Sequence, residues 1–207
     1  MKKEFIANTP NRKIKINLLA KFIPKEKVLV DKSCFNELCK KCKNYGKKYA
    51  CPPNSPEFNT LCKKEGLFVV LFKCNLEQIK NTSEYNKIRI ANSVMKSRID
   101  KLMRALEENL ENKFKFLSSG SCRLCKKCNF EKQLPCKYPL KMRFSLEATG
   151  INVEKITKEL FGLPLLWYNH ASHKAPEYTC VVAGLMCDKK DVALIEQELE
   201  KVQNNKL

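Results

Sequence analysis

Residues 121–153 read SCRLCKKCNFEKQLPCKYPLKMRFSLEATGINV and gather four cysteines within fifteen positions: Cys122, Cys125, Cys128 and Cys136. Three thiols in a C-x2-C-x2-C spacing can converge on one centre, as they do in the ferredoxin-type loops that bind cubane iron-sulfur clusters. Structural zinc sites usually combine two separated ligand pairs, so the third cysteine is surplus to that arrangement. The spacing therefore favours an iron-sulfur cluster, with zinc as the alternative.

A second cysteine group lies upstream, in CFNELCKKCKNYGKKYACPP, and consists of Cys34, Cys39, Cys42 and Cys51. Cys39 and Cys42 form a C-x2-C pair, and the turn predicted at Tyr45-Gly46 lets the chain return with Cys51. The sequence leaves open whether Cys34 is the fourth ligand. If Cys34 is not a ligand, one iron of a cluster would keep a free coordination position. The alternative to a cluster here is a zinc knuckle that staples the loop.

The remaining cysteines and the two histidines are predicted to have ordinary structural roles. We expect Cys62, Cys74, Cys180 and Cys187 to pack in the core, because isolated free cysteines behave as small apolar residues. His170 and His173 stand in the connector NHASHKAPE. They could bind metal or move protons, but a pair on a solvent-facing loop explains them as well.

Composition limits the classes of protein. A chain of 207 residues can bury a core without help from a metal. Twelve cysteines with no recognisable signal peptide indicate reduced thiols in the cytoplasm. The apolar runs are too short to cross a membrane. We therefore expect a cytoplasmic protein that does not enter membranes.

Positive charge is concentrated around the cysteines. The net charge is +18, and residues 1–150 carry 33 Lys and Arg against 14 Asp and Glu. Such a surface can attract an acidic redox partner protein, a larger enzyme complex, a phosphorylated substrate or nucleic acid. Nucleic acid is the less favoured partner because few aromatic residues interleave with the lysines, and a merely solvated surface is the simpler explanation of the charge.

Hydrophobic periodicity predicts the regular elements. Leu67–Cys74 is a continuous apolar run typical of a buried strand, and Lys27–Val30, Leu163–Tyr168 and Tyr178–Met186 are further expected strands, with Ile14–Leu18 either strand or short helix. Ser83–Asn112 predicts one long amphipathic helix in which Met95 and Met103 fill the core. Shorter helices are expected after Ser55, Ser121 and Asn152 and over Asp191–Gln203.

These elements predict an α+β fold, with a small mixed sheet packed by the long helix and two cysteine-rich metal-binding lobes. We expect a single domain over residues 1–207. Its parts are the first lobe at about 33–66, the helix at 83–112, the second lobe at 120–150 and an α/β part at 151–207.

Three motifs carry a resemblance to a known family: CKNYGKKYACPP, SCRLCKKC and PCKYPLKMRFSLEATGINV. Together they resemble the predicted metal-binding family called domain of unknown function 2284, found mainly in anaerobic bacteria and methanogens. The resemblance spans nearly the whole chain and departs from the family pattern at Phe144, where proline is expected. It implies that Cys39, Cys42, Cys51, Cys122, Cys125, Cys128 and Cys136 bind metal, and it transfers no reaction.

The sequence therefore supports three functional hypotheses. The leading one is an iron-sulfur protein with two [4Fe-4S] clusters that transfers electrons or serves as a redox accessory in an anaerobe. The second is a cluster-dependent enzyme whose open iron moves sulfur or a small ligand. The third is a zinc-stapled adaptor that binds nucleic acid. Whether the chain is an enzyme is left open.

Overall fold

Five strands form one sheet in the order β1-β2-β3-β5-β4, with β3 (Gly66–Asn75) in the middle and β5 (Tyr178–Cys187) beside it. The computed structural model describes residues 1–206. The remaining strands are β1 (Lys2–Thr9), β2 (Arg12–Pro24) and β4 (Lys115–Leu117). Neighbouring strands all pair antiparallel, so the α+β class is confirmed but the expectation of a mixed sheet is wrong.

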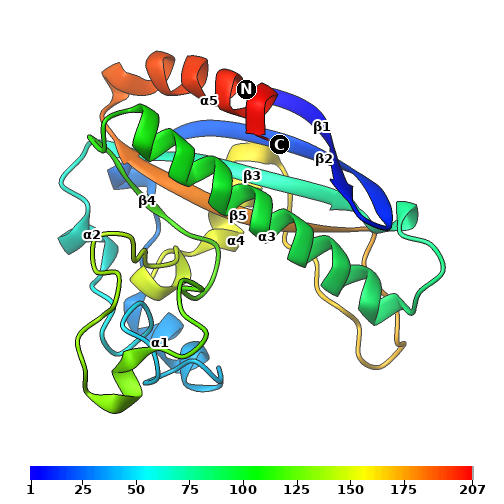
Figure 1. Ribbon diagram of the computed structural model, residues 1–207, viewed down its shortest axis with the longest axis horizontal. Coiled ribbons are helices and arrows are strands. Elements are labelled where there is room, and N and C mark those ends of the chain that lie inside the picture. The colour runs from blue at the N-terminus through cyan, green and yellow to red at the C-terminus, as the bar shows by residue number, and fades with distance from the viewer. Residues whose placement is uncertain (207) are drawn as a thin grey trace.

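Helices cover the sheet on both sides (Figure 1). The helices are α1 (Lys32–Lys40), α2 (Phe58–Leu61), α3 (Glu84–Asn109), α4 (Val153–Phe161) and α5 (Val192–Lys206). Helices α3 and α5 pack on one face, and α4 packs on the other. The segments that carry the two cysteine groups form a body below one end of the sheet, around α1 (Figure 1).

Strand β3 is buried on both faces, which explains its unbroken apolar sequence. Phe68, Val70 and Phe72 belong to the core beneath α3 and α5. Leu67, Val69 and Leu71 belong to the opposite core, which includes residues of α2 and α4. The predicted strands at 67–74 and 178–186 are confirmed, and residues 14–18 lie within β2.

The predicted long helix is confirmed as α3, and Ser83 caps it by accepting a 3.4 Å hydrogen bond from the Asn86 amide. Met95 and Met103 are fully buried, as expected for core residues. Asn152 caps α4 and Gly162 ends it, as the sequence predicts. The C-terminal helix is also confirmed as α5.

Two predictions failed where side chains have tertiary partners. Ser55 does not cap a helix, because its hydroxyl donates to the carbonyl of Ala148, and only the single turn of α2 forms nearby. Ser121 begins no helix either: residues 121–128 are irregular, and the Ser121 hydroxyl accepts from Lys48. Neither partner can be found from local sequence.

Two predicted strands are absent and two real strands were missed. Lys27–Val30 forms only an isolated bridge from Val30 to Ile151, and 163–168 form no strand. In contrast, residues 2–9 form the edge strand β1, and residues 115–117 form β4. In β1 the apolar Ile6 is exposed and the charged Lys3 lies on the more buried side, so the sequence shows no regular alternation, and β4 is too short to show one.

Residues 29–32 join the cysteine-rich body to the rest of the chain by pairing with residues 150–152. The Asp31 amide donates to the Gly150 carbonyl at 2.8 Å, and the Asn152 amide donates to the Leu29 carbonyl at 2.9 Å. Gly150 has a φ of +88°, and a Cβ there would lie 2.8 Å from the Cα of Lys32. Only glycine combines this conformation with so close an approach.

A buried ion pair between Glu107 and Arg143 joins α3 to the loop that follows Cys136. The Arg143 Nη2 atom lies 2.5 Å from Glu107 Oε2, and the two side chains are only 10% and 4% exposed. Glu107 also accepts the Phe116 amide of β4 at 2.8 Å. One carboxylate therefore holds a strand and a loop against the helix.

We predict that Glu107→Ala lowers the free energy of unfolding by about 3–5 kcal/mol, because it leaves the Arg143 guanidinium buried without its partner. Glu159→Ala, which breaks the exposed 3.8 Å pair between Lys155 and Glu159, is the matched control and should change stability by less than about 1 kcal/mol. Urea denaturation measures both. Equal effects of the two substitutions would contradict the role assigned to Glu107.

Candidate metal centre

The four cysteines of the second group line one cavity. Its walls include all four thiol-bearing residues, which are Cys122, Cys125, Cys128 and Cys136. The loop that holds them contains no helix or strand and only the short 3-10 turn Asn129–Lys132. Arg123 ties this loop to α3 by donating to the Lys96 carbonyl at 3.2 Å. The cavity thus has all four cysteines of the predicted second group in its wall.

The first group is divided by α1. Cys39 is the penultimate residue of this helix, and Cys42 follows its end, with the Cys42 amide bonded to the Cys39 carbonyl at 2.8 Å. Cys51 is buried, whereas Cys34 is exposed in the first turns of α1. Five residues of helix turn Cys34 about 140° away from Cys39, so the two thiols do not share a helix face.

The two cysteine segments interlock, so the structure does not separate them into two lobes. Lys48 of the first segment donates to the Cys122 carbonyl at 2.8 Å. Tyr49 donates to the Leu134 carbonyl at 2.7 Å, and its ring meets that of Phe130 edge-on. Lys48, Tyr49 and Ala50 form part of the wall of the second group's cavity. No spacing rule relates these residues to Cys122, so the sequence alone does not predict their place in the wall.

Electrostatics show that the segments meet at Cys51. Burial raises the pKa of Cys51 to about 11, Lys48 opposes this shift, and the neighbouring Cys42, Cys39 and Cys122 thiols add to it. Burial likewise raises the pKa of Cys122, while the Leu124 amide and Lys48 oppose the rise. For Cys39, burial raises the pKa, and Cys42 and Glu147 contribute. Without metal, these thiols are protonated at neutral pH.

The chemical types of the donors suit a thiolate-bound metal group, but their present positions do not form one. The residues around the second cavity offer four thiols and the thioether of Met142, and they include no histidine or carboxylate. In the described part of the chain, however, no three Cys, His, Asp or Glu side chains are grouped so that they could hold a metal ion. The space between the walls is about 20 Å³, roughly one water molecule. A bound cluster would therefore require the irregular loop to open.

The other cysteines lie in the core, as predicted. Cys62, Cys74 and Cys187 are fully buried, and Cys180 packs against the core beneath α4. Burial raises the pKa of Cys74 to about 11 and those of Cys180 and Cys187 to about 12. These thiols are therefore unreactive at neutral pH.

Both histidines are exposed on the connector between α4 and β5. The His170 ring packs edge-on against Tyr168, with the ring centroids 5.0 Å apart. His173 has a φ of +53° in the turn that follows. Neither residue lines the cavity of the second cysteine group.

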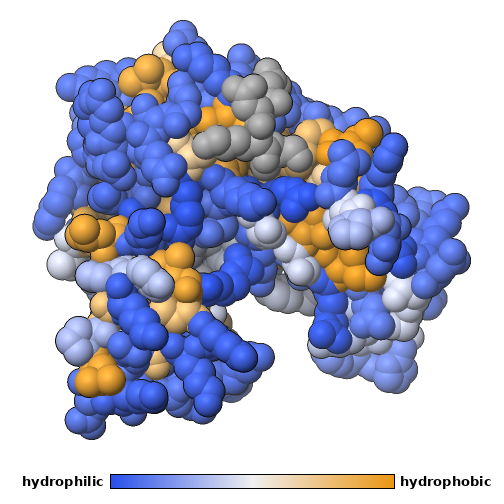
Figure 2. Space-filling model, in the orientation of Figure 1, coloured by the Kyte–Doolittle hydropathy of each residue, from blue (hydrophilic) through white to orange (hydrophobic). Residues whose placement is uncertain are grey.

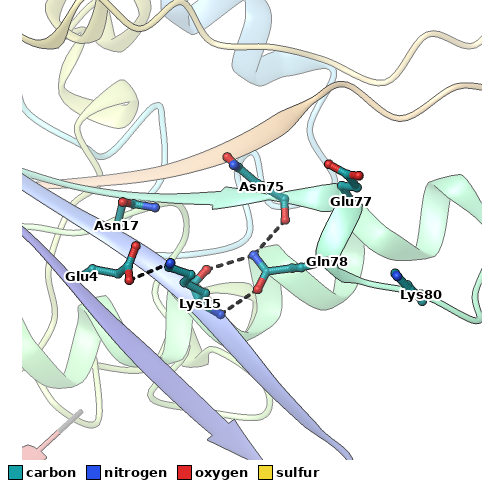
Figure 3. Close-up of a pocket in the computed structure, with 7 residues that line it drawn as sticks. All are labelled: Glu4, Lys15, Asn17, Asn75, Glu77, Gln78 and Lys80. Atoms are coloured by element: carbon teal, nitrogen blue, oxygen red, sulfur yellow. Dashed lines mark hydrogen bonds and ion pairs between the residues drawn. The ribbon is translucent and has the colours of Figure 1, made fainter.

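A cleft of about 520 Å³ at the opposite end of the sheet is held by polar contacts of its own (Figure 3). The Gln78 side chain accepts from the Lys15 amide and donates to the Lys15 and Asn75 carbonyls. Lys15 also pairs with Glu4 at 2.9 Å. These contacts join the end of β3 to β2, so the polar residues that line the cleft have a structural role.

Hydrophilic residues cover most of the face in Figure 2, which is hollowed between the cysteine-rich body and the arm at lower right. Exposed cations surround the cysteines: Lys40, Lys41, Lys43, Lys47, Arg123, Lys126, Lys127, Lys132, Lys137 and Lys141. Among the described residues, no helix combines the length and apolar character needed to span a bilayer.

Comparison with known proteins finds one relationship. No curated protein and no solved structure gives a significant match to the chain. A family model described as "Predicted metal-binding protein (DUF2284)" matches residues 21–183, a range that contains both cysteine groups and the loops that interlock them. Since this match covers well over half of the chain, the protein belongs to the predicted metal-binding family DUF2284.

Proposed function

We propose that this protein binds two [4Fe-4S] clusters and transfers electrons to or from a partner protein in an anaerobe. The observation that carries the proposal is the single cavity lined by Cys122, Cys125, Cys128 and Cys136. Four thiolates are the ligand set of a cubane cluster, and three of them follow the ferredoxin-type spacing. Each cluster would accept one electron from a reduced partner and pass one to an oxidised partner.

Cations close to the thiols support a redox role. Lys48 reaches the Cys122 carbonyl and lowers the pKa of both Cys51 and Cys122 against the effect of burial. A positive charge in this position also favours a reduced cluster over an oxidised one. The same residue that joins the two segments would therefore raise the reduction potential.

The proposal predicts about eight iron and eight acid-labile sulfide per chain after purification without oxygen, with an EPR signal on reduction by dithionite. Cys128→Ala should lose about half of the iron, because it removes one ligand of the second group. Stoichiometric zinc without sulfide would reject the proposal and favour the zinc-stapled adaptor.

The exposure of Cys34 favours a second candidate function, a cluster-dependent enzyme. If Cys39, Cys42 and Cys51 alone hold the first cluster, one iron keeps a position for a sulfur-containing or other small ligand. The position of Cys34 in the first turns of α1, about 140° around the helix from Cys39, supports this ligand set.

For Cys34→Ala we expect unchanged iron and sulfide contents and an unchanged EPR spectrum, since the exposed thiol lies on a different face of α1 from Cys39. Cys39→Ala is the matched variant on the same helix and should lose the first cluster. Loss of iron from Cys34→Ala would make Cys34 the fourth ligand and argue against an open iron.

The exposed lysines around both cysteine segments suit an acidic redox partner, which long-range attraction would guide to the clusters. Electron transfer with an acidic ferredoxin should therefore slow by about tenfold or more as salt rises from 20 to 500 mM, because the Debye length shrinks. Stopped-flow absorbance measures the rate. The basic cytochrome c is the control and should show no such slowing; equal salt effects on both proteins would contradict an acidic partner.

A further inference from the structure

A cavity of about 340 Å³ lies beneath the first half of α3, between that helix, β5 and the connector after α4. Its size is at the lower end of the range for small-molecule sites. In Figure 2 the molecule is hollowed between the cysteine-rich body and the arm that the connector and the start of α3 form (Figures 1 and 2). None of the cysteines assigned to metal lines this cavity, so it is a separate site.

Three aromatic side chains are among the residues that line the cavity. Trp167, the only tryptophan, is 75% exposed, and Tyr85 is 51% exposed. Tyr168 packs edge-on against Tyr85, with centroids 5.3 Å apart, which fixes the connector to α3. All three residues line the cavity, together with the apolar Leu165 and Val182. Exposed aromatic rings beside an apolar hollow favour a ligand that stacks.

Polar groups also line the cavity, and two of them have an oxygen without a hydrogen-bond partner. Ser119 and Glu147 both line the cavity. Within the described part of the chain, Ser119 Oγ and Glu147 Oε2 are inaccessible to solvent and have no hydrogen-bond partner. Lys96 adds a positive charge. A buried oxygen without a partner is costly, and a ligand that brings hydrogen-bond donors would relieve that cost if the wall adjusts.

Two of these polar residues also lie close to the cysteine segments. Ser119 stands three residues before Cys122, and the next cavity residue, Gly120, belongs to the same turn. Glu147 acts electrostatically on Cys39, since it contributes to the raised pKa of that thiol. A molecule in this cavity would thus lie against the turn that leads into the second group and against the carboxylate beside the first.

From this arrangement we propose that the cavity binds a planar aromatic nitrogen heterocycle. The flat ring stacks on Trp167 or Tyr85, and its N–H groups donate toward Glu147 and Ser119. Lys96 is a donor for a ring carbonyl. An aliphatic chain would leave these polar groups unpaired. The site goes beyond electron transfer and does not depend on which metal the cysteines bind.

The test uses the metal-loaded full chain, purified without oxygen, with lumiflavin and adenine as probes. Both molecules are planar and carry N–H donors, whereas naphthalene, the control probe, offers no hydrogen-bonding group. Equilibrium dialysis should show saturable, one-to-one binding of at least one heterocycle and binding of naphthalene at least tenfold weaker. The fluorescence of Trp167 should change over the same concentration range. Absence of saturable binding by both heterocycles would overturn the proposal.

Two substitutions assign the contacts. Trp167→Ala removes an exposed ring and should weaken heterocycle binding by about tenfold, as loss of base stacking does elsewhere. Glu147→Ala should weaken it by a similar factor while leaving the weak binding of naphthalene unchanged. Leu194→Ala, on the exposed side of α5, is the control and should bind like the parent protein. Unchanged affinity in both Trp167→Ala and Glu147→Ala would contradict the site.

Metal analysis of the same samples separates this proposal from the previous one. Heterocycle binding by a protein that contains zinc or no cluster would reject the iron-sulfur function and leave the cavity's role intact. Iron-loaded protein that binds neither probe would reject the proposed role of the cavity and leave the iron-sulfur function intact. Because Glu147 lies near Cys39, the iron content of Glu147→Ala must equal that of the parent before its affinity is compared.

Discussion

The contact between Lys48 and the carbonyl of Cys122 is the interaction on which the candidate site depends. It brings residues that are 74 positions apart in sequence within 2.8 Å and places the Lys48–Ala50 segment in the wall of the second cysteine cavity. Tyr49 and its hydrogen bond to the Leu134 carbonyl support the same junction from the other end of the loop. The two cysteine groups are therefore built against each other and not on independent supports.

The layered part of the fold holds this junction in place. The buried ion pair of Glu107 and Arg143 fixes the loop after Cys136 to α3, while Gly150 allows residues 29–32 to pass close to the chain before α4. The irregular loops of the cysteine-rich body contain little hydrophobic core of their own, since the two buried clusters centre on the sheet. The sheet and α3 supply the rigidity that the loops lack.

The sequence predicted the elements whose signals are local. The unbroken apolar run of β3, the capped periodic pattern of α3 and the Asn152 to Gly162 boundaries of α4 were all readable because propensity and burial agree there. It failed for Ser55 and Ser121, whose hydroxyls have partners distant in sequence, and for 163–168, whose apolar residues line a cavity and form no strand. The cysteine spacing identified the second group, but the junction through Lys48 and the position of Cys34 required coordinates.

The cavity lined by the second cysteine group and the neighbouring pocket share structural elements. The turn at Ser119 and Gly120 borders the pocket and leads directly into Cys122, so a change in the loop on metal binding would shift residues of the pocket wall.

The most direct test of the central claim is anomalous X-ray diffraction at the iron edge on crystals grown without oxygen. The account predicts iron density among Cys122, Cys125, Cys128 and Cys136, and separate iron density beside Cys39, Cys42 and Cys51. Sulfurs that are vacant, joined as disulfides or bound only to zinc would contradict it.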